Sequence, residues 1–142
     1  MDENLRREII LDNFTNPQNR ETVTDSNYIY VNSNNESCID NIDLWIKIEE
    51  DIITDIKFNG EACAISTAST SIMTTKLTGL TIEEAKQFIQ NFSGMINEEN
   101  YDRNLMEEAL VFDEIYKQAN RKTCALLPYN GILKALEKYE KK

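Results

Sequence analysis

Hydrophobic positions in the first 60 residues change from helical spacing to a two-residue alternation. Leu5, Ile9 and Ile10 recur at helical spacing and Pro17 follows closely, which predicts a helix over residues 4–14. Apolar and polar residues then alternate as they do in half-buried strands, over residues 28–31, 42–48 and 52–58. The acidic residues between the last two segments fit a tight turn. This pattern predicts a three-stranded antiparallel sheet with one covered face.

A change to small and hydroxyl-bearing side chains follows the last predicted strand. Residues 62–77, after Gly60, suit a helix that packs closely on the sheet, and Gly79 would end it. Thr81 and Glu84 have the spacing of a capping box, in which two side chains satisfy free backbone N–H groups at a helix start. A second helix is therefore predicted directly after Gly79.

The remainder of the chain is predicted to be mainly helical. We expect a loop at 93–103, a helix near 104–119 and a last helix over 125–140, with Pro128 tolerated in its first turn. The order of elements predicts an α+β fold, in which a three-stranded antiparallel sheet carries helices packed on one face.

Length and charge limit the possible classes of protein. With 142 residues, 41% of them hydrophobic, the chain fits one domain over residues 1–142. The net charge of -10 has the wrong sign for binding phosphates, so we expect neither nucleic acid nor a membrane as partner, but another protein. We find no signal-like start and no run of about 20 apolar residues, and expect a cytoplasmic protein.

Cysteine and histidine counts direct attention to thiol chemistry. The cysteines are Cys38, Cys63 and Cys124, and an odd number without an export signal argues against a disulfide framework. Histidine is absent, which excludes a Ser-His or Cys-His catalytic triad within the chain. Metal binding and thiol reactivity remain as the candidate chemistries.

The predicted elements suggest where these thiols lie. Cys38 and Asp40 occupy a polar loop between two strands, Cys63 lies where a strand passes into a helix, and Cys124 lies just before the last helix. Helix N-termini favour thiolates. Three thiolates and a carboxylate are a complete tetrahedral set for zinc, which the fold would have to assemble. The alternative is that the cysteines are small buried hydrophobes and Asp40 a turn residue, and the residues alone leave both open.

Four segments together resemble the SufU/IscU family, the NifU N-terminal-like proteins of iron-sulfur cluster assembly. They are ILDNFTNPQNR, ESCID, NGEACAIS and RKTCALLPY. The resemblance extends over residues 5–140. The long interval between Cys63 and Cys124, and the lack of the Leu-Pro-Pro-Val-Lys motif and its adjacent histidine before Cys124, resemble the SufU branch. The first cysteine site reads Cys38-Ile39-Asp40, where the family usually has Cys-Gly-Asp.

The resemblance implies a ligand set and a reaction. Cys38, Asp40, Cys63 and Cys124 would be the metal ligands, with zinc as the metal or, alternatively, an iron-sulfur cluster. Cys38 would be the catalytic residue, accepting persulfide sulfur from a SufS-type cysteine desulfurase. The leading hypothesis is thus a zinc-dependent sulfurtransferase. A non-enzymatic scaffold for cluster assembly and a metal-free adaptor that regulates a desulfurase are the alternatives.

Overall fold

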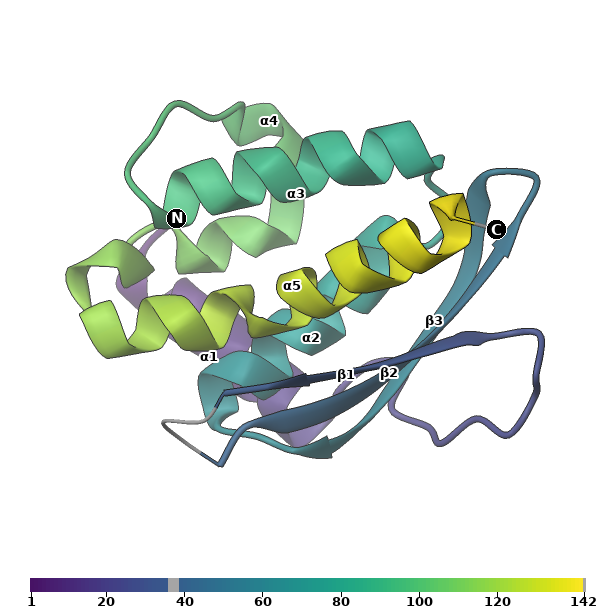
Figure 1. The fold of residues 1–142 in the computed structure, drawn as a ribbon. Helices are drawn as coiled ribbons and strands as arrows, with labels where there is room; N and C mark the ends of the chain where they lie inside the picture. Colours follow the sequence, from purple (N-terminus) through teal and green to yellow (C-terminus); the bar gives the residue numbers. More distant parts are fainter. Residues whose placement is uncertain (36–38, 142) are drawn as a thin grey trace.

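An antiparallel sheet with the strand order β1-β2-β3 forms one side of the molecule in the computed structural model, which describes residues 1–35 and 39–141 (Figure 1). The strands are β1 (Ile29–Asn34), β2 (Asn41–Glu49) and β3 (Ile52–Glu61). Leu44 at the centre of β2 pairs with Val31 of β1 and Phe58 of β3. Glu50 and Asp51 join β2 to β3 with positive φ angles of 51° and 63°, which is typical of a type I′ hairpin turn. The predicted sheet is confirmed.

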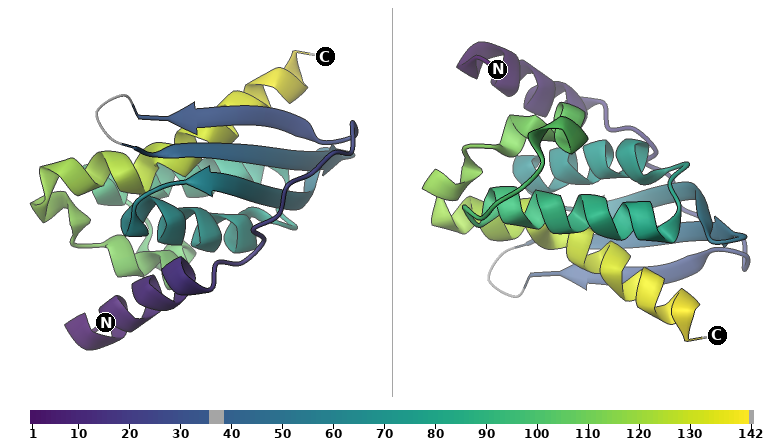
Figure 2. Two further views of the ribbon diagram at one scale, coloured as in Figure 1. Left: turned by 90° about the horizontal axis from the view of Figure 1, so that it is seen from below. Right: turned by 90° about the horizontal axis from the view of Figure 1, so that it is seen from above.

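The helices cover one face of this sheet, as predicted (Figure 2). They are α1 (Glu3–Thr15), α2 (Ala64–Leu77), α3 (Ile82–Ile96), the short α4 (Arg103–Met106), the 3₁₀ helices η1 (Glu107–Phe112) and η2 (Ile115–Lys117), and α5 (Ala119–Glu140). Helices α2 and α5 pack directly on the strands, and α1 and α3 pack on those two helices. Leu44, Ile46 and Ile56 are fully buried beneath them. The α+β fold class is confirmed.

Small side chains let α2 lie close to its neighbours. Ser69 and Ser71 are fully buried, and their hydroxyls donate 2.7 Å hydrogen bonds to the carbonyl of Ala125 on α5 and to Asn13 Oδ1 on α1. These bonds satisfy hydroxyls that would otherwise be costly to bury. The predicted close packing of this helix is confirmed, and α2 is tied to both flanking helices.

Two predicted boundaries after Gly79 are wrong. The capping box of Thr81 and Glu84 starts α3 as predicted, but α3 continues to Ile96, into the segment expected to be a loop. The helix expected near 104–119 is broken into α4, η1 and η2. The break falls at Glu107, whose φ of 48° and ψ of -123° lie outside the helical region.

The last helix begins earlier than predicted. It starts at Ala119, which places Pro128 at its tenth position instead of in the first turn. Proline has no N–H to donate to the carbonyl four residues earlier, which belongs to Cys124. The hydroxyl of Ser66 on α2 donates to that carbonyl at 3.0 Å. A hydroxyl of the neighbouring helix, which also lies 2.7 Å from Asp40 Oδ2, thus faces the acceptor that the proline leaves, and α5 continues through it.

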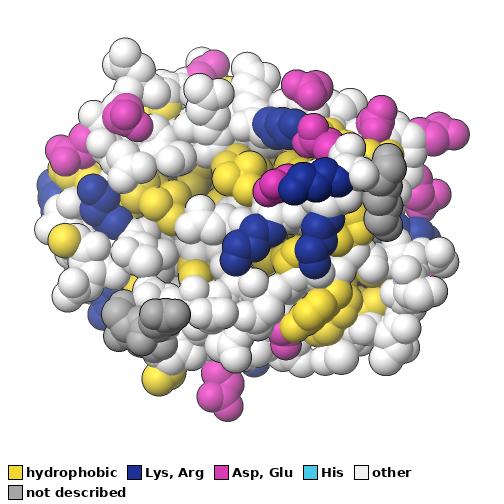
Figure 3. Space-filling view, in the orientation of Figure 1, with side chains coloured by type: hydrophobic (Ala, Val, Ile, Leu, Met, Phe, Trp, Pro, Cys, Tyr) yellow, Lys and Arg dark blue, Asp and Glu magenta, His cyan; other side chains and the backbone are white. Residues whose placement is uncertain are grey.

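Charge is unevenly distributed on the face seen in Figure 3. Lys and Arg side chains gather over the C-terminal half of α5, the end remote from Cys124, while acidic side chains lie mostly around the margin of this face (Figure 3). Within the described part of the chain, no helix combines the length and apolar character needed to cross a membrane. The net charge of -10 therefore does not describe every face of the molecule.

Candidate metal centre

Three of the four predicted ligands lie together at one end of the sheet. One donor atom each from Asp40, Cys63 and Cys124 lies within 4.8 Å of the others. They come from three separate elements, because Asp40 precedes β2, Cys63 precedes α2 and Cys124 belongs to α5. Cys38, the fourth predicted ligand, lies outside the described residues. The fold therefore assembles a site whose members are far apart in the sequence.

Asp40 is buried, with 1% of its surface exposed, and its carboxylate accepts two short hydrogen bonds. The backbone N–H of Cys63 donates to Oδ1 at 2.7 Å, and the hydroxyl of Ser66 donates to Oδ2 at 2.7 Å. Its own carbonyl accepts from the N–H of Asn35 at 3.1 Å. Hydrogen bonds to a carboxylate are among the stronger ones in proteins. Both the backbone and the side chain of Asp40 are thus fixed.

Cys63 is the N-cap residue of α2, as the sequence predicts. Its Sγ accepts a hydrogen bond from the N–H of Ser66 at 3.4 Å, and it lies 3.7 Å from Asp40 Oδ2. An N-cap side chain faces the free N–H groups of the first helical turn, where partial positive charge favours an anion. The position suits a sulfur ligand that is a thiolate when a metal is bound.

The predicted position of Cys124 is wrong. It is the sixth residue of α5, so the argument that it precedes a helix N-terminus does not apply. Burial, followed by the nearby Cys63 and Asp40, raises the pKa of Cys124 to about 12. Without a metal this side chain is a neutral thiol, which lies 3.5 Å from the carbonyl of Asn120. A cation would be needed to make it a thiolate at neutral pH.

The donors fit a small thiophilic cation. Tetrahedral zinc with bonds of about 2.0–2.3 Å requires donors roughly 3.3–3.8 Å apart. The distance of 3.7 Å between Cys63 Sγ and Asp40 Oδ2 matches this requirement. Two sulfurs and a carboxylate would repel one another once all were ionised, and a divalent cation removes that repulsion. Asp40, Cys63 and Cys124 can therefore hold zinc, or the iron of a cluster, together with a further ligand.

An open pocket of about 480 Å³ leads to these side chains. Ile39, which is 75% exposed, and Arg121 line it together with the three candidate ligands. Arg121 places a positive charge at this pocket. The pocket gives a partner molecule access to the donor atoms.

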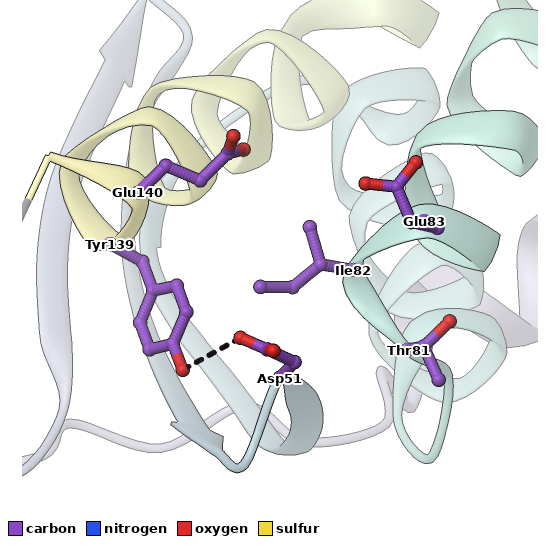
Figure 4. A pocket seen from close by; sticks show the side chains of 6 residues that line it. All are labelled: Asp51, Thr81, Ile82, Glu83, Tyr139 and Glu140. Carbon is purple, nitrogen blue, oxygen red and sulfur yellow. Dashed lines mark hydrogen bonds between the residues drawn. The ribbon is translucent and has the colours of Figure 1, made fainter.

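A larger hollow of about 620 Å³ lies at the opposite end of β2 (Figure 4). Its lining includes Asp51, Glu83 and Glu140, and the hydroxyl of Tyr139 donates to Asp51 Oδ1 at 3.0 Å. Glu140 forms an ion pair with Lys86 outside the lining. The hollow contains acidic and apolar side chains but no thiol, so the candidate chemistry lies in the pocket beside Cys63.

Sequence reasoning did not single out Ser66 as part of this site. It interpreted the serine and threonine residues of α2 only as close helix packing. One local signal could have linked Ser66 to Cys63. Ser66 stands three residues after Cys63, the spacing at which an N-cap side chain meets the backbone of the first helical turn. The contact of Ser66 with Asp40 spans 26 residues and requires the fold.

The family described as NifU-like N terminal domain matches residues 5–142. The zinc-dependent sulfurtransferase SufU of Bacillus subtilis is 36% identical over 137 residues, which are 96% of this chain and 92% of that protein. The iron-sulfur cluster assembly scaffold protein IscU of Thermotoga maritima is 31% identical over 131 residues, 92% of each chain.

A solved structure agrees with these relatives. FiSufU of Fervidobacterium islandicum AW-1, a candidate iron-sulfur cluster assembly scaffold protein for the SUF system, superposes with a TM-score of 0.87 and 28% identity, covering 95% of this chain and 99% of that one. Sequence and fold thus agree over almost the whole chain, and the chain belongs to the NifU-like N-terminal domain family, the family of SufU and IscU.

Proposed function

We propose that the chain is an iron-sulfur cluster assembly protein of SufU type, a zinc-binding sulfurtransferase that takes sulfur from a cysteine desulfurase. The convergence of Asp40, Cys63 and Cys124 within 4.8 Å carries this proposal. The relative from Bacillus subtilis, named a zinc-dependent sulfurtransferase, supports it. Cys38 would complete the ligand set, and the protein would act in the cytoplasm, where thiols stay reduced.

Zinc would hold the ligand sulfurs as thiolates at neutral pH and offset the repulsion between them. The chain itself supplies the arrangement. Asp40 is oriented by two hydrogen bonds, and Cys63 is placed by the start of α2. The buried thiol of Cys124 is protected from solvent. The resemblance to SufU implies Cys38 as the sulfur acceptor, and we assign the reaction to it.

The proposed transfer conserves atoms and electrons. The thiolate of Cys38 attacks the terminal sulfur of a persulfide on the desulfurase, forming a new sulfur-sulfur bond. The bond between that sulfur and the desulfurase cysteine breaks, and the desulfurase thiolate leaves with the electron pair. Cys38 becomes a persulfide without an added oxidant or reductant. Arg121, which lines the pocket, favours the approach of the anionic donor.

A scaffold that assembles an iron-sulfur cluster is the second candidate, and the relative from Thermotoga maritima named as such supports it. Thiolate ligands suit both zinc and iron-sulfur clusters, so the donor set fits either function. The two candidates differ in what the protein receives. A sulfurtransferase receives sulfur alone, whereas a scaffold receives iron and sulfide together.

The test is to incubate the zinc-loaded protein with a SufS-type cysteine desulfurase and cysteine, and to map persulfides by alkylation and mass spectrometry. We expect faster alanine formation and one additional sulfur on Cys38, with both effects lost in Cys38→Ser. A Ser69→Ala variant, altered on the same helix as Ser66 but hydrogen-bonded to Ala125 and to none of the described ligands, serves as the control. Persulfide on Cys63 or Cys124 in place of Cys38, or no sulfur on any cysteine, contradicts the proposal.

A further inference from the structure

The side chain of Ser66 meets all three candidate ligands that the structure describes. Its Oγ lies 2.7 Å from Asp40 Oδ2, 3.6 Å from Cys63 Sγ and 3.0 Å from the carbonyl oxygen of Cys124. Its N–H donates to Cys63 Sγ at 3.4 Å. Ser66 is fully buried, so no solvent competes for its hydroxyl. One small side chain therefore connects the loop before β2, the start of α2 and the second turn of α5.

The carbonyl of Cys124 is available to this hydroxyl because of Pro128. In a regular helix, the residue four positions later would donate its N–H to that carbonyl, and proline has none. The proline thus leaves the carbonyl of the ligand Cys124 without its usual donor in α5. The hydroxyl of Ser66 on the neighbouring helix faces that carbonyl, so Pro128 affects the hydrogen bonds of the site.

Asp40 Oδ2 and the carbonyl oxygen of Cys124 compete for the single hydroxyl proton of Ser66. The hydroxyl of Ser66 can donate fully to Asp40 or to the Cys124 carbonyl, or divide its hydrogen bond between them. The shorter distance favours Asp40. Oδ1 of Asp40 is already held by the N–H of Cys63, so the bond from Ser66 fixes the remaining rotation of the carboxylate.

We propose that Ser66 is a positioning residue of the metal site, whose hydroxyl holds the Asp40 carboxylate beside Cys63 and ties it to the backbone of α5 at Cys124. The inference deepens the proposed function and rests on it. Hydrogen bonds that orient metal ligands commonly change metal affinity by about 10- to 100-fold. Ser66 acts through the ligands and is not itself a ligand in this proposal.

Ser69 provides a matched control. It lies on the same helix, is equally buried and donates a 2.7 Å hydrogen bond to a backbone carbonyl of α5, that of Ala125. The structure gives Ser69 Oγ no hydrogen bond to Asp40, Cys63 or Cys124 within the described residues. Ser66→Ala and Ser69→Ala therefore remove the same kind of group from the same packing layer, and only the first removes a contact with the ligands.

The experiment measures zinc affinity by competition with a chromophoric chelator, and thermal unfolding of each metal-free protein. We expect Ser66→Ala to lower zinc affinity by about 10-fold or more, and Ser69→Ala by less than about 3-fold. Both variants should lose similar stability without metal. Ser66→Thr keeps the hydroxyl and should recover most of the affinity, which also provides a readout if Ser66→Ala folds poorly. In an Asp40→Ala background, Ser66→Ala should have little further effect.

The outcomes separate the two proposals. If the unaltered protein binds zinc and Ser66→Ala binds it equally well, the role of Ser66 is wrong and the proposed function stands. Equal losses of affinity in Ser66→Ala and Ser69→Ala assign the effect to packing and also contradict this role. If the unaltered protein binds no zinc, the proposed function fails, and the inference fails with it.

Discussion

The backbone N–H of Cys63 donates a 2.7 Å hydrogen bond to the carboxylate of Asp40, a residue 23 positions earlier in the chain. The backbone of one candidate ligand thus orients the side chain of another. The bond joins the loop before β2 to the start of α2. It limits the rotation of the carboxylate, which reduces the entropy that the side chain would lose on binding a cation.

Replacing Asp40 tests this arrangement. We expect Asp40→Ala to lower zinc affinity by about 10-fold or more, because an anionic donor and its fixed orientation are both lost. Asp40→Asn keeps an oxygen that can accept from Cys63, but a neutral amide is a weaker zinc ligand, so its affinity should fall as well. Chelator competition measures the change. Asp43→Asn removes the same charge from β2, away from the site, and should leave the affinity unaltered. A similar decrease there would assign the effect to net charge.

The raised pKa of Cys124 predicts how the metal-free protein responds to pH. The pKa is about 12 in the folded protein and about 8.5 in an unfolded chain, so above the lower value the unfolded state releases the proton first. The stabilisation is complete below about pH 8.5 and decreases as pH rises toward 12, by at most about 1.4 kcal/mol per pH unit.

Urea unfolding of the metal-free protein at about pH 7.5 and about pH 9.5 measures this dependence. Cys124→Ala should show a smaller decrease in the free energy of unfolding over the same interval. An equal decrease in the variant would mean that other groups cause it. Zinc binding should conversely become tighter as pH rises, since the proton on Cys124 must leave.

Gly60 is expected to be irreplaceable near the site. Its φ is 129°, and a Cβ there would overlap the carbonyl oxygen of Asn41, the residue after Asp40. Gly60→Ala should reduce the free energy of unfolding by roughly 3 kcal/mol or more, and also weaken zinc binding, because Asn41 must move. Chemical denaturation and chelator competition measure the two effects.

Gly79→Ala is the matched control. Gly79 also has a positive φ, of 94°, but a Cβ there meets no atom within 4 Å. The Gly79→Ala variant should be destabilised by backbone strain alone, by about 1 kcal/mol, and its zinc affinity should be unchanged. If Gly60→Ala were as mild as Gly79→Ala, the close approach to Asn41 would be wrong.

Glu107 allows a test of backbone strain. Its φ of 48° and ψ of -123° suit glycine and strain other residues, and its side chain also pairs with Lys76 at 2.6 Å. Glu107→Gly and Glu107→Ala both lose the ion pair with Lys76, so the difference between their stabilities reports the backbone alone. We expect the glycine variant to be more stable than the alanine variant by about 1–3 kcal/mol in chemical denaturation. A more stable alanine variant would contradict the strained turn, because alanine is favoured wherever the backbone is helical.

The sequence predicted the elements whose signals are local. The alternation around Leu44 located the strands, and Thr81 with Glu84 located the start of α3. The broken segment at Glu107 was missed, because nothing in the sequence marks a positive φ at a glutamate. The early start of α5 was missed because a proline was expected near a helix start. In the structure the hydroxyl of Ser66 lies within hydrogen-bond distance of the carbonyl that Pro128 leaves.

The candidate metal site could likewise be predicted only as far as local signals in the sequence allow. Asp40, Cys63 and Cys124 could be selected from their chemistry and from the family resemblance, and the structure brings these three together. The environment of Cys124 was predicted wrongly, since it depended on the boundary of α5. The contribution of Ser66 depends on contacts across 26 and 58 residues, which no spacing in the sequence reveals.

The most direct test of the metal centre is the zinc and iron content of protein purified anaerobically without added metal, beside a Cys63→Ala variant. The proposal predicts about one zinc per chain in the unaltered protein and a marked loss in the variant. About two or more irons per chain with matching sulfide would contradict the sulfurtransferase and favour the scaffold. An unaltered protein without either metal would contradict both.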